Sequence, residues 1–158
     1  YSVRVSNPTD KNPNYTGHRF EVRFEACEEC HSSAEIGELL VEGTQAVISN
    51  KIQEVVGLLR NWGVSNAPTT LRNKSGPLAW EYATAGQLST ALMSTITNKP
   101  PTSSEQALIP NSIKQARFNV YLVEHDGSKG VHNAKYARYL LNVAKTNVLA
   151  ELAKPPLP

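Results

Sequence analysis

The stretch that decides the fold runs from residue 33 to residue 62 and reads SAEIGELLVEGTQAVISNKIQEVVGLLRNW. Its apolar side chains recur every three or four residues, which is the period of an α-helix. The recurring residues are Ile36, Leu40, Val47, Val55, Leu59 and Trp62. Ser32 or Ser33 can cap the amino-terminal end, and Gly63 follows where a helix stop is expected. The sequence therefore predicts one long helix over residues 33–62.

Helical periodicity continues towards the C-terminus. Further helices are expected over residues 77–97, 104–124 and 133–152, with a loop over residues 63–77 before them. Pro110 either kinks the helix predicted over 104–124 or marks its true start. Only a short glycine-containing turn separates the last two helices, so we expect them to form an antiparallel hairpin.

The segment before the long helix has a different pattern. Phe20, Val22 and Phe24 alternate with charged residues, which is typical of an extended segment. The expected fold is therefore mainly α, with an irregular N-terminal segment followed by three to four long helices. Because 158 residues is the length of one domain, we expect a single domain. Its parts would be an irregular segment over 1–32, a helical platform over 33–153 and a proline-rich tail over 154–158.

The chain's only two cysteines lie close together, in Cys27-Glu28-Glu29-Cys30-His31. This is the attachment pattern of c-type haem, in which two thioethers fix the haem edge. The histidine that follows then becomes the proximal iron ligand. A cysteine-rich zinc site would need a second cysteine pair, and a thioredoxin-like redox pair would need a βαβ setting. The sequence therefore predicts one haem c, attached through Cys27 and Cys30 and ligated by His31. The single domain over 1–158 would then be a c-type haem domain, with residues 1–32 as its haem-attachment segment.

The distal iron ligand has several candidates. His132 stands at the start of the last predicted helix, directly after a glycine-containing turn, and His18 precedes the haem motif by nine residues. His125 and the single methionine Met93 are further candidates, and the iron site could also be open. We expect His132, with His18 as the alternative. Two imidazole ligands leave no vacant iron site, which suits electron transfer, and no catalytic residue is predicted.

Several stretches together resemble a known family. Residues 116–119 (ARFN), 126–128 (DGS) and 130–141 (GVHNAKYARYLL) resemble the C-terminal helical hairpin of multihaem cytochromes c. The likeness is greatest to the penta- and octahaem group of the nitrite-reductase type. His18 ahead of the haem motif also resembles the last haem-binding portion of those proteins.

This resemblance implies roles for both candidate distal ligands. In that group, the histidine that opens the C-terminal helix ligates a haem attached about a hundred residues upstream, and His132 follows Cys27 by 105 residues. His18 would then serve a different haem, such as one on a neighbouring subunit. The chain has one haem motif and no Cys-x-x-Cys-Lys. The resemblance therefore implies an electron-transfer scaffold and argues against nitrite reduction by this chain.

The composition of the chain argues against several other classes of function. The net charge is +2, from 16 basic and 14 acidic side chains, so no strong field attracts nucleic acid or an anionic membrane. Apolar runs are only a few residues long, which excludes a membrane span. We expect an electron carrier that meets redox partner proteins, self-associates as a homo-oligomer or polymer, or contacts a neighbouring haem subunit through His18. Competing functions are a five-coordinate haem enzyme, a sensor of gases or nitrogen oxides, and a structural haem subunit of a polymer.

The expected location follows from the chemistry of haem attachment. Covalent attachment needs reduced thiols and a maturation system, which bacteria place outside the cytoplasmic membrane. We therefore expect a periplasmic or extracellular protein.

Overall fold

The computed structural model describes residues 24–82 and 99–158. His18, Met93 and most of the predicted helix over 77–97 lie outside these ranges. The described part is mainly helical and contains no strand, which confirms the expected mainly α class. None of its helices is both long and apolar enough to cross a membrane. The chain divides into two compact units, Tyr1–Gly43 and Thr44–Pro158, hereafter the first and second units.

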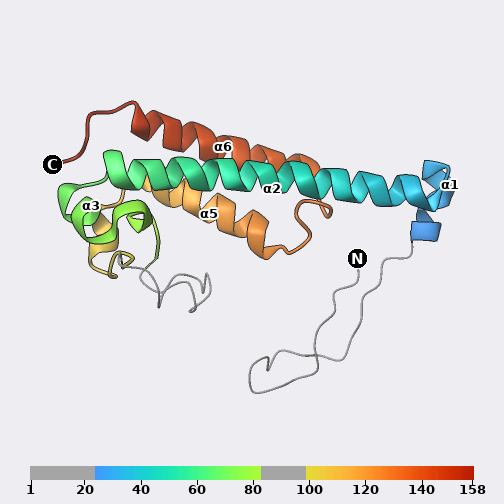
Figure 1. Cartoon of the computed structure of the whole chain (residues 1–158), viewed down its shortest axis with the longest axis horizontal. Helices are drawn as coiled ribbons and strands as arrows, with labels where there is room; N and C mark the ends of the chain where they lie inside the picture. Colours follow the sequence, from blue (N-terminus) through green and yellow to red (C-terminus); the bar gives the residue numbers. More distant parts are fainter. Residues whose placement is uncertain (1–23, 83–98) are drawn as a thin grey trace, which may run out of the picture. The chain divides into compact units, whose positions relative to one another are not determined.

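The first unit contains the haem motif. A short 3₁₀ helix, η1 (Phe24–Cys27), leads into the one-turn helix α1 (Glu28–His31), and α2 (Ala34–Ser65) begins after two further residues (Figure 1). The extended segment predicted up to Phe24 is wrong at that residue. The chain is helical there because it turns back onto α2, where Cys27 lies against Gly37.

Ser33 starts α2 in the way that the sequence predicted. Its hydroxyl accepts a hydrogen bond from the backbone N–H of Ile36 at 3.3 Å, which satisfies one of the free donors at the helix start. The preceding Ser32 has a φ of 66°, so the chain changes direction between α1 and α2.

The second unit is built around one apolar core. It contains the rest of α2, then α3 (Thr69–Ser75), η2 (Gly76–Leu78), η3 (Glu105–Leu108), α5 (Asn111–His125) and α6 (Ala134–Leu152). Helices α2, α5 and α6 run side by side (Figure 1). The side chains between them are mostly large and apolar, and each contributes roughly 1.5–3 kcal/mol on burial. The largest completely buried ones include Ile48, Leu59, Trp62, Ile113, Leu141 and Val148.

The predicted apolar stripe of the long helix splits into two faces. Leu59 and Trp62 are fully buried, whereas Ile36, Leu40 and Val47 remain 43%, 51% and 41% exposed. At 3.6 residues per turn, the three exposed residues lie about a third of a turn away from the buried face. The core-facing row of α2 therefore begins at Ile48 and not at Ile36.

Gly63 does not end the long helix, contrary to the sequence prediction. Helix α2 continues through it to Ser65. A Cβ atom on Gly63 would lie 2.6 Å from the carbonyl oxygen of Gly76. The glycine is needed because η2 approaches the helix closely at this point.

The segment after α2 also differs from the prediction. Helix α3 occupies part of the expected loop over 63–77, and its seven residues are too few to show a clear period. The helix predicted from residue 77 starts as the 3₁₀ turn η2, and residues 79–82 that follow are not helical.

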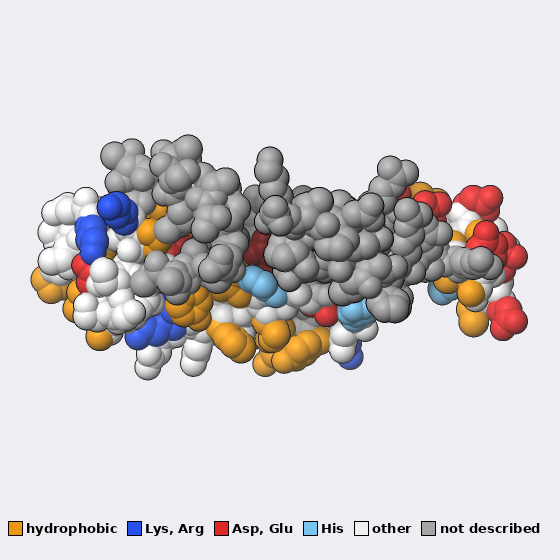
Figure 2. Space-filling model, turned by 90° about the horizontal axis from the view of Figure 1, so that it is seen from below, with side chains coloured by type: hydrophobic (Ala, Val, Ile, Leu, Met, Phe, Trp, Pro, Cys, Tyr) orange, Lys and Arg blue, Asp and Glu red, His pale blue; other side chains and the backbone are white. Residues whose placement is uncertain are grey.

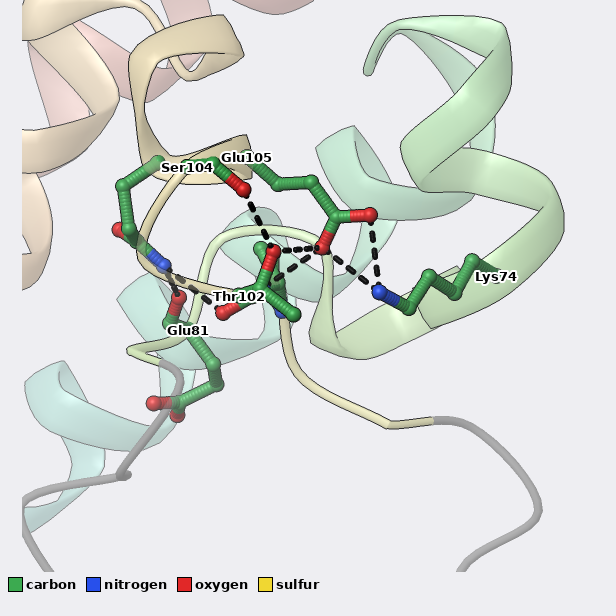
Figure 3. Close-up of polar contacts among 7 residues, drawn as sticks. Lys74, Glu81, Thr102, Ser104 and Glu105 are labelled. Atoms are coloured by element: carbon green, nitrogen blue, oxygen red, sulfur yellow. Dashed lines mark hydrogen bonds and ion pairs between the residues drawn. The ribbon is translucent and has the colours of Figure 1, made fainter.

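The start of α5 is fixed by Pro110, the residue that caps it. The helix predicted from Ser104 is therefore interrupted, and its first turn is the separate helix η3. Glu105 of η3 accepts two hydrogen bonds from the Lys74 ammonium group, at 2.8 and 2.7 Å, and one from the backbone N–H of Thr102 at 2.6 Å (Figure 3). These bonds tie η3 to α3.

Helices α5 and α6 pack in opposite directions. Ser112 near the start of α5 donates a hydrogen bond to Glu151 near the end of α6. At mid-length the Asn119 side chain donates to the carbonyl oxygen of Leu140 at 3.1 Å. The start of α6 agrees with the prediction, because the Asn133 side chain accepts a hydrogen bond from the N–H of Tyr136 at 3.0 Å.

The connection over residues 126–133 turns sharply between the two helices. Gly127, Lys129 and Gly130 all have positive φ values, of 71°, 51° and 86°. Gly130 also has no room for a side chain, since a Cβ atom there would lie 2.7 Å from Cγ1 of Ile48. The connection is thereby held against α2, and it carries His132.

Candidate functional site

The haem motif forms a single helical turn in the first unit. Cys27 is the residue before α1, and Cys30 and His31 are its last two residues. Positions three and four residues apart lie on the same side of a helix. The two sulfur atoms and the imidazole therefore project from one side of one turn.

The accessibility of this turn fits a covalently attached group. Both cysteines are free thiols; Cys30 and His31 are exposed, and Cys27 is partly buried. Cys27 lies against Gly37, where an added Cβ atom would be 2.9 Å from the Cys27 Cβ and 3.4 Å from its Sγ. The turn is thus held close to α2 while Cys30 and His31 remain exposed.

The second unit presents His132 on the connection between α5 and α6. Its Nδ1 lies 3.0 Å from Oδ1 of Asp126, and its side chain is 72% exposed. The other carboxylate oxygen of Asp126 accepts a hydrogen bond from the Ser128 hydroxyl. The Ser128 hydroxyl in turn accepts a hydrogen bond from the backbone N–H of His132, with 3.3 Å between the nitrogen and Oγ.

These contacts determine the proton position on His132. The hydrogen bonds from Ser128 and His132 lower the pKa of Asp126, so this carboxyl is ionised at neutral pH. An ionised carboxylate only accepts hydrogen bonds, so Nδ1 of His132 must be the donor. In a ring that carries this one proton, the Nε2 atom has a free lone pair, which is what an iron ligand needs.

A small apolar pocket lies beside His132. Its volume is about 160 Å³, and its apolar walls come from both α5 and α6. Ligand pockets usually measure about 300–1,000 Å³, so this one accommodates only the edge of a large cofactor. The lining residues are Leu122, Val123, Asp126, Gly130, His132, Asn133, Tyr136, Ala137 and Leu140.

Large apolar side chains are also exposed near this pocket. Leu122 and Tyr136 of its lining are 43% and 51% exposed, and Tyr136 stacks on Tyr139 with ring centroids 6.5 Å apart. Figure 2 shows hydrophobic side chains uncovered on one face of the molecule, with histidine side chains next to them. An apolar surface beside an imidazole suits a flat, largely apolar cofactor.

The serine, histidine and aspartate of this connection do not form a hydrolytic triad. In such a triad the hydroxyl is hydrogen-bonded to the histidine, which acts as its base. Here the hydroxyl of Ser128 is bonded to Asp126 instead. The arrangement therefore orients an imidazole and activates no nucleophile.

His125 provides a comparison within the same unit. It is the last residue of α5, and its Nδ1 lies 2.9 Å from the carbonyl oxygen of Tyr121. Its ring also contacts the Tyr121 ring edge-on, with centroids 5.5 Å apart. His125 therefore also presents Nε2, but a neutral carbonyl stands behind it where His132 has a carboxylate.

Four aromatic residues of the second unit differ in their burial. Trp80 and Tyr121 are buried in the core, whereas Phe118 is 58% exposed. Tyr82 is partly buried and lies under the Arg117 guanidinium group at 3.4 Å. Trp80 and Tyr121 are therefore core residues.

A buried polar cluster surrounds Tyr121, and no pattern in the sequence indicates it. The Tyr121 hydroxyl donates a hydrogen bond to Glu81, which is 2% exposed. Burial raises the pKa of Glu81 despite this bond and the nearby Arg117 charge. Arg117 donates to the carbonyl oxygen of Trp80 at 2.7 Å and to Gln106 at 2.9 Å. These bonds join α5 to the segments on both sides of residues 83–98, which indicates a structural role.

The structure thus brings the predicted site residues into two groups. Cys27, Cys30 and His31 share one turn in the first unit, and His132 meets Asp126 in the second. Sequence reasoning missed Asp126, although its position in an Asp-Gly-Ser turn six residues before His132 was a usable signal. The described residues contain no cluster of three or more His, Cys, Asp or Glu side chains that could hold a bare metal ion. The chain matches no model of a protein family, no curated protein and no solved structure.

Proposed function

We propose that this protein is an electron carrier with one haem c. The haem is attached through Cys27 and Cys30, with His31 as the proximal ligand and His132 as the distal ligand. The observation that carries the proposal is the α1 turn, which presents two free thiols and an imidazole from one side. The presentation of His132, with Nδ1 engaged and Nε2 free, supports the second ligand.

The two histidines and the helices α5 and α6 would have different roles in this function. When bound, the haem supplies a one-electron iron couple. His31 and His132 would hold the haem iron, and with both imidazoles bound it would take up neither water nor small ligands, which suits electron transfer. Helices α5 and α6 act as the rigid platform that fixes the position of His132.

The proposal extends to partners and location. The protein exchanges electrons with redox partner proteins and self-associates, or it meets a neighbouring haem subunit through His18. Exposed apolar side chains on α2, such as Leu39 at 64% exposure, support self-association. The location is periplasmic or extracellular, where c-type haem is attached in bacteria.

The first test is a visible spectrum of protein produced together with a c-type maturation system. We expect sharp reduced α and β bands and no high-spin band when oxidised. Haem should stay on the chain during denaturing electrophoresis and be visible with a haem stain. Cys27→Ala or Cys30→Ala should weaken or abolish the stained band. A protein without a Soret band contradicts the proposal.

The second test identifies the distal ligand. His132→Ala should convert the spectrum to high-spin and allow CO to bind the reduced iron. His125→Ala is the matched control, since it removes an exposed imidazole of the same unit and should leave the spectrum unchanged. A wild-type protein that is already high-spin and binds CO or nitrite would favour a haem enzyme or a sensor.

A further inference from the structure

The contact between Asp126 and His132 suggests a function beyond holding the turn together. We propose that Asp126 is a positioning residue that fixes the tautomer of His132 and lowers the reduction potential of the haem that this histidine ligates. The inference rests on the proposed ligation by His132, and it concerns how the second unit sets the properties of that ligand.

The geometry is that of an outer-shell carboxylate behind a metal-binding imidazole. The Nδ1 atom of His132 is 3.0 Å from Oδ1 of Asp126, and Nε2 is on the opposite side of the ring. Histidines that bind metals commonly donate the second ring N–H to a carboxylate, which fixes the ring and makes the ligating nitrogen more basic. Here the carboxylate is itself fixed, because Ser128 donates to its other oxygen.

The electronic consequence follows from charge. A carboxylate that accepts the Nδ1 proton draws it partly away, and the ring acquires some imidazolate character. A more electron-rich ligand stabilises Fe(III) over Fe(II), so the reduction potential falls. A carbonyl acceptor such as the one behind His125 carries no full charge and has a weaker effect.

Other charged groups near this connection do not share the contact. Glu124, Lys129 and Lys135 are exposed and make no ion pair with the described residues. Exposed charges of this kind act through water and are screened by salt. Among the acidic groups near this connection, Asp126 is therefore the one whose removal should change the potential most, because it contacts the ring directly.

The test is potentiometry on the haem-loaded protein. Asp126→Asn keeps the shape of the side chain and removes its charge. We expect the variant to remain six-coordinate and its midpoint potential to rise. A tenfold change in the equilibrium constant of reduction corresponds to about 59 mV for one electron. Ser128→Ala should shift the potential in the same direction by less, because Asp126 stays charged but is less well oriented.

The control is Glu124→Gln, which removes a carboxylate from the last turn of α5, next to the connection, without touching His132. Its potential should change much less than that of Asp126→Asn. Asp126→Glu restores the charge and should return the potential towards the wild-type value. The hyperfine-shifted proton NMR signals of the axial histidine ring should move in Asp126→Asn and not in Glu124→Gln.

The possible failures are distinguishable. If Asp126→Asn leaves the potential unchanged, or shifts it no more than Glu124→Gln does, the carboxylate only stabilises the turn and the inference is wrong. If haem is absent, or if His132→Ala keeps the wild-type spectrum, the proposed ligation fails first and the inference fails with it.

Discussion

The two units of the chain differ in how they hold the residues proposed to meet the haem. In the described part of the first unit, Gly37 is the only buried residue, and six exposed glutamates occur with no lysine or arginine. Every buried apolar side chain of the described residues lies in the second unit. The haem motif therefore lies in a segment with almost no buried side chains, whereas His132 is mounted on a well-packed helix pair.

The same contrast appears in charge. The first unit has four basic and eight acidic side chains, and the second has twelve basic and six acidic ones. A net charge of +2 for the whole chain conceals this separation. The stability of the second unit should come from its buried core, and the order of the motif segment should depend on the haem attachment proposed above.

The largest expected effect compares two leucines of the same helix. Leu59→Ala in α2 removes a fully buried side chain and should lower the free energy of unfolding by about 3 kcal/mol. Leu39→Ala, at a position that is 64% exposed, should change it by less than about 0.5 kcal/mol. Urea denaturation followed by circular dichroism measures both. Equal losses from the two substitutions would show that the first unit has a core of its own.

A second comparison uses the glycines of α2. Gly63→Ala brings a Cβ atom to 2.6 Å from a backbone oxygen, and we expect a loss of roughly 1–3 kcal/mol. Gly57→Ala meets no atom within 4 Å in the same helix and should stabilise the protein by up to about 1 kcal/mol. Thermal unfolding midpoints that move in opposite directions are the expected result. A stabilising Gly63→Ala would mean that η2 can move away from α2.

A third comparison removes one helix cap from each unit. Asn133→Ala deletes the cap of α6 and should cost about 1 kcal/mol of global stability. Ser33→Ala deletes the corresponding cap of α2, and we expect no change in global unfolding because that helix start lies outside the core. Amide hydrogen exchange should instead become faster near Ile36. A global loss from Ser33→Ala would contradict the separation of the two units.

Helices that have both a capping residue and a regular apolar stripe could be predicted from the sequence. Helix α6 has a capping asparagine and a regular apolar stripe, and it begins and ends where they indicate. Gly63 was misread because a glycine required by close packing looks the same in sequence as one that ends a helix. Helix α3 was missed because its stability comes from tertiary contacts, such as Arg72 donating to the carbonyl oxygen of Ser65 at 3.1 Å.

The candidate site likewise has one part that the sequence predicts and one part that depends on the folded structure. The spacing of Cys27, Cys30 and His31 is local, so the sequence alone places them on one turn. The partner of His132 depends on how the turn after α5 folds back, with positive φ values at Gly127 and Gly130. The Glu81–Tyr121 contact joins residues forty positions apart and has no local signal.

The smallest expected effect concerns acid pH and again lies in the second unit. Hydrogen bonds from Lys74 and Thr102 lower the pKa of Glu105 to about 2, so its contribution to stability is complete above its ordinary pKa of 4.5. That contribution should be lost as the pH falls from 4.5 to about 2 and should be absent in Glu105→Gln. Glu38→Gln removes an exposed carboxylate from the first unit and should leave the pH profile of global unfolding unchanged.

Glu81→Gln should act oppositely to Glu105→Gln, because burial raises the pKa of Glu81 and stability is lost as the pH rises from 4.5 through that raised pKa. Urea titrations at a series of pH values separate the three variants, and a Glu105→Gln profile identical to the wild type would show that the Lys74 contact does not persist in solution.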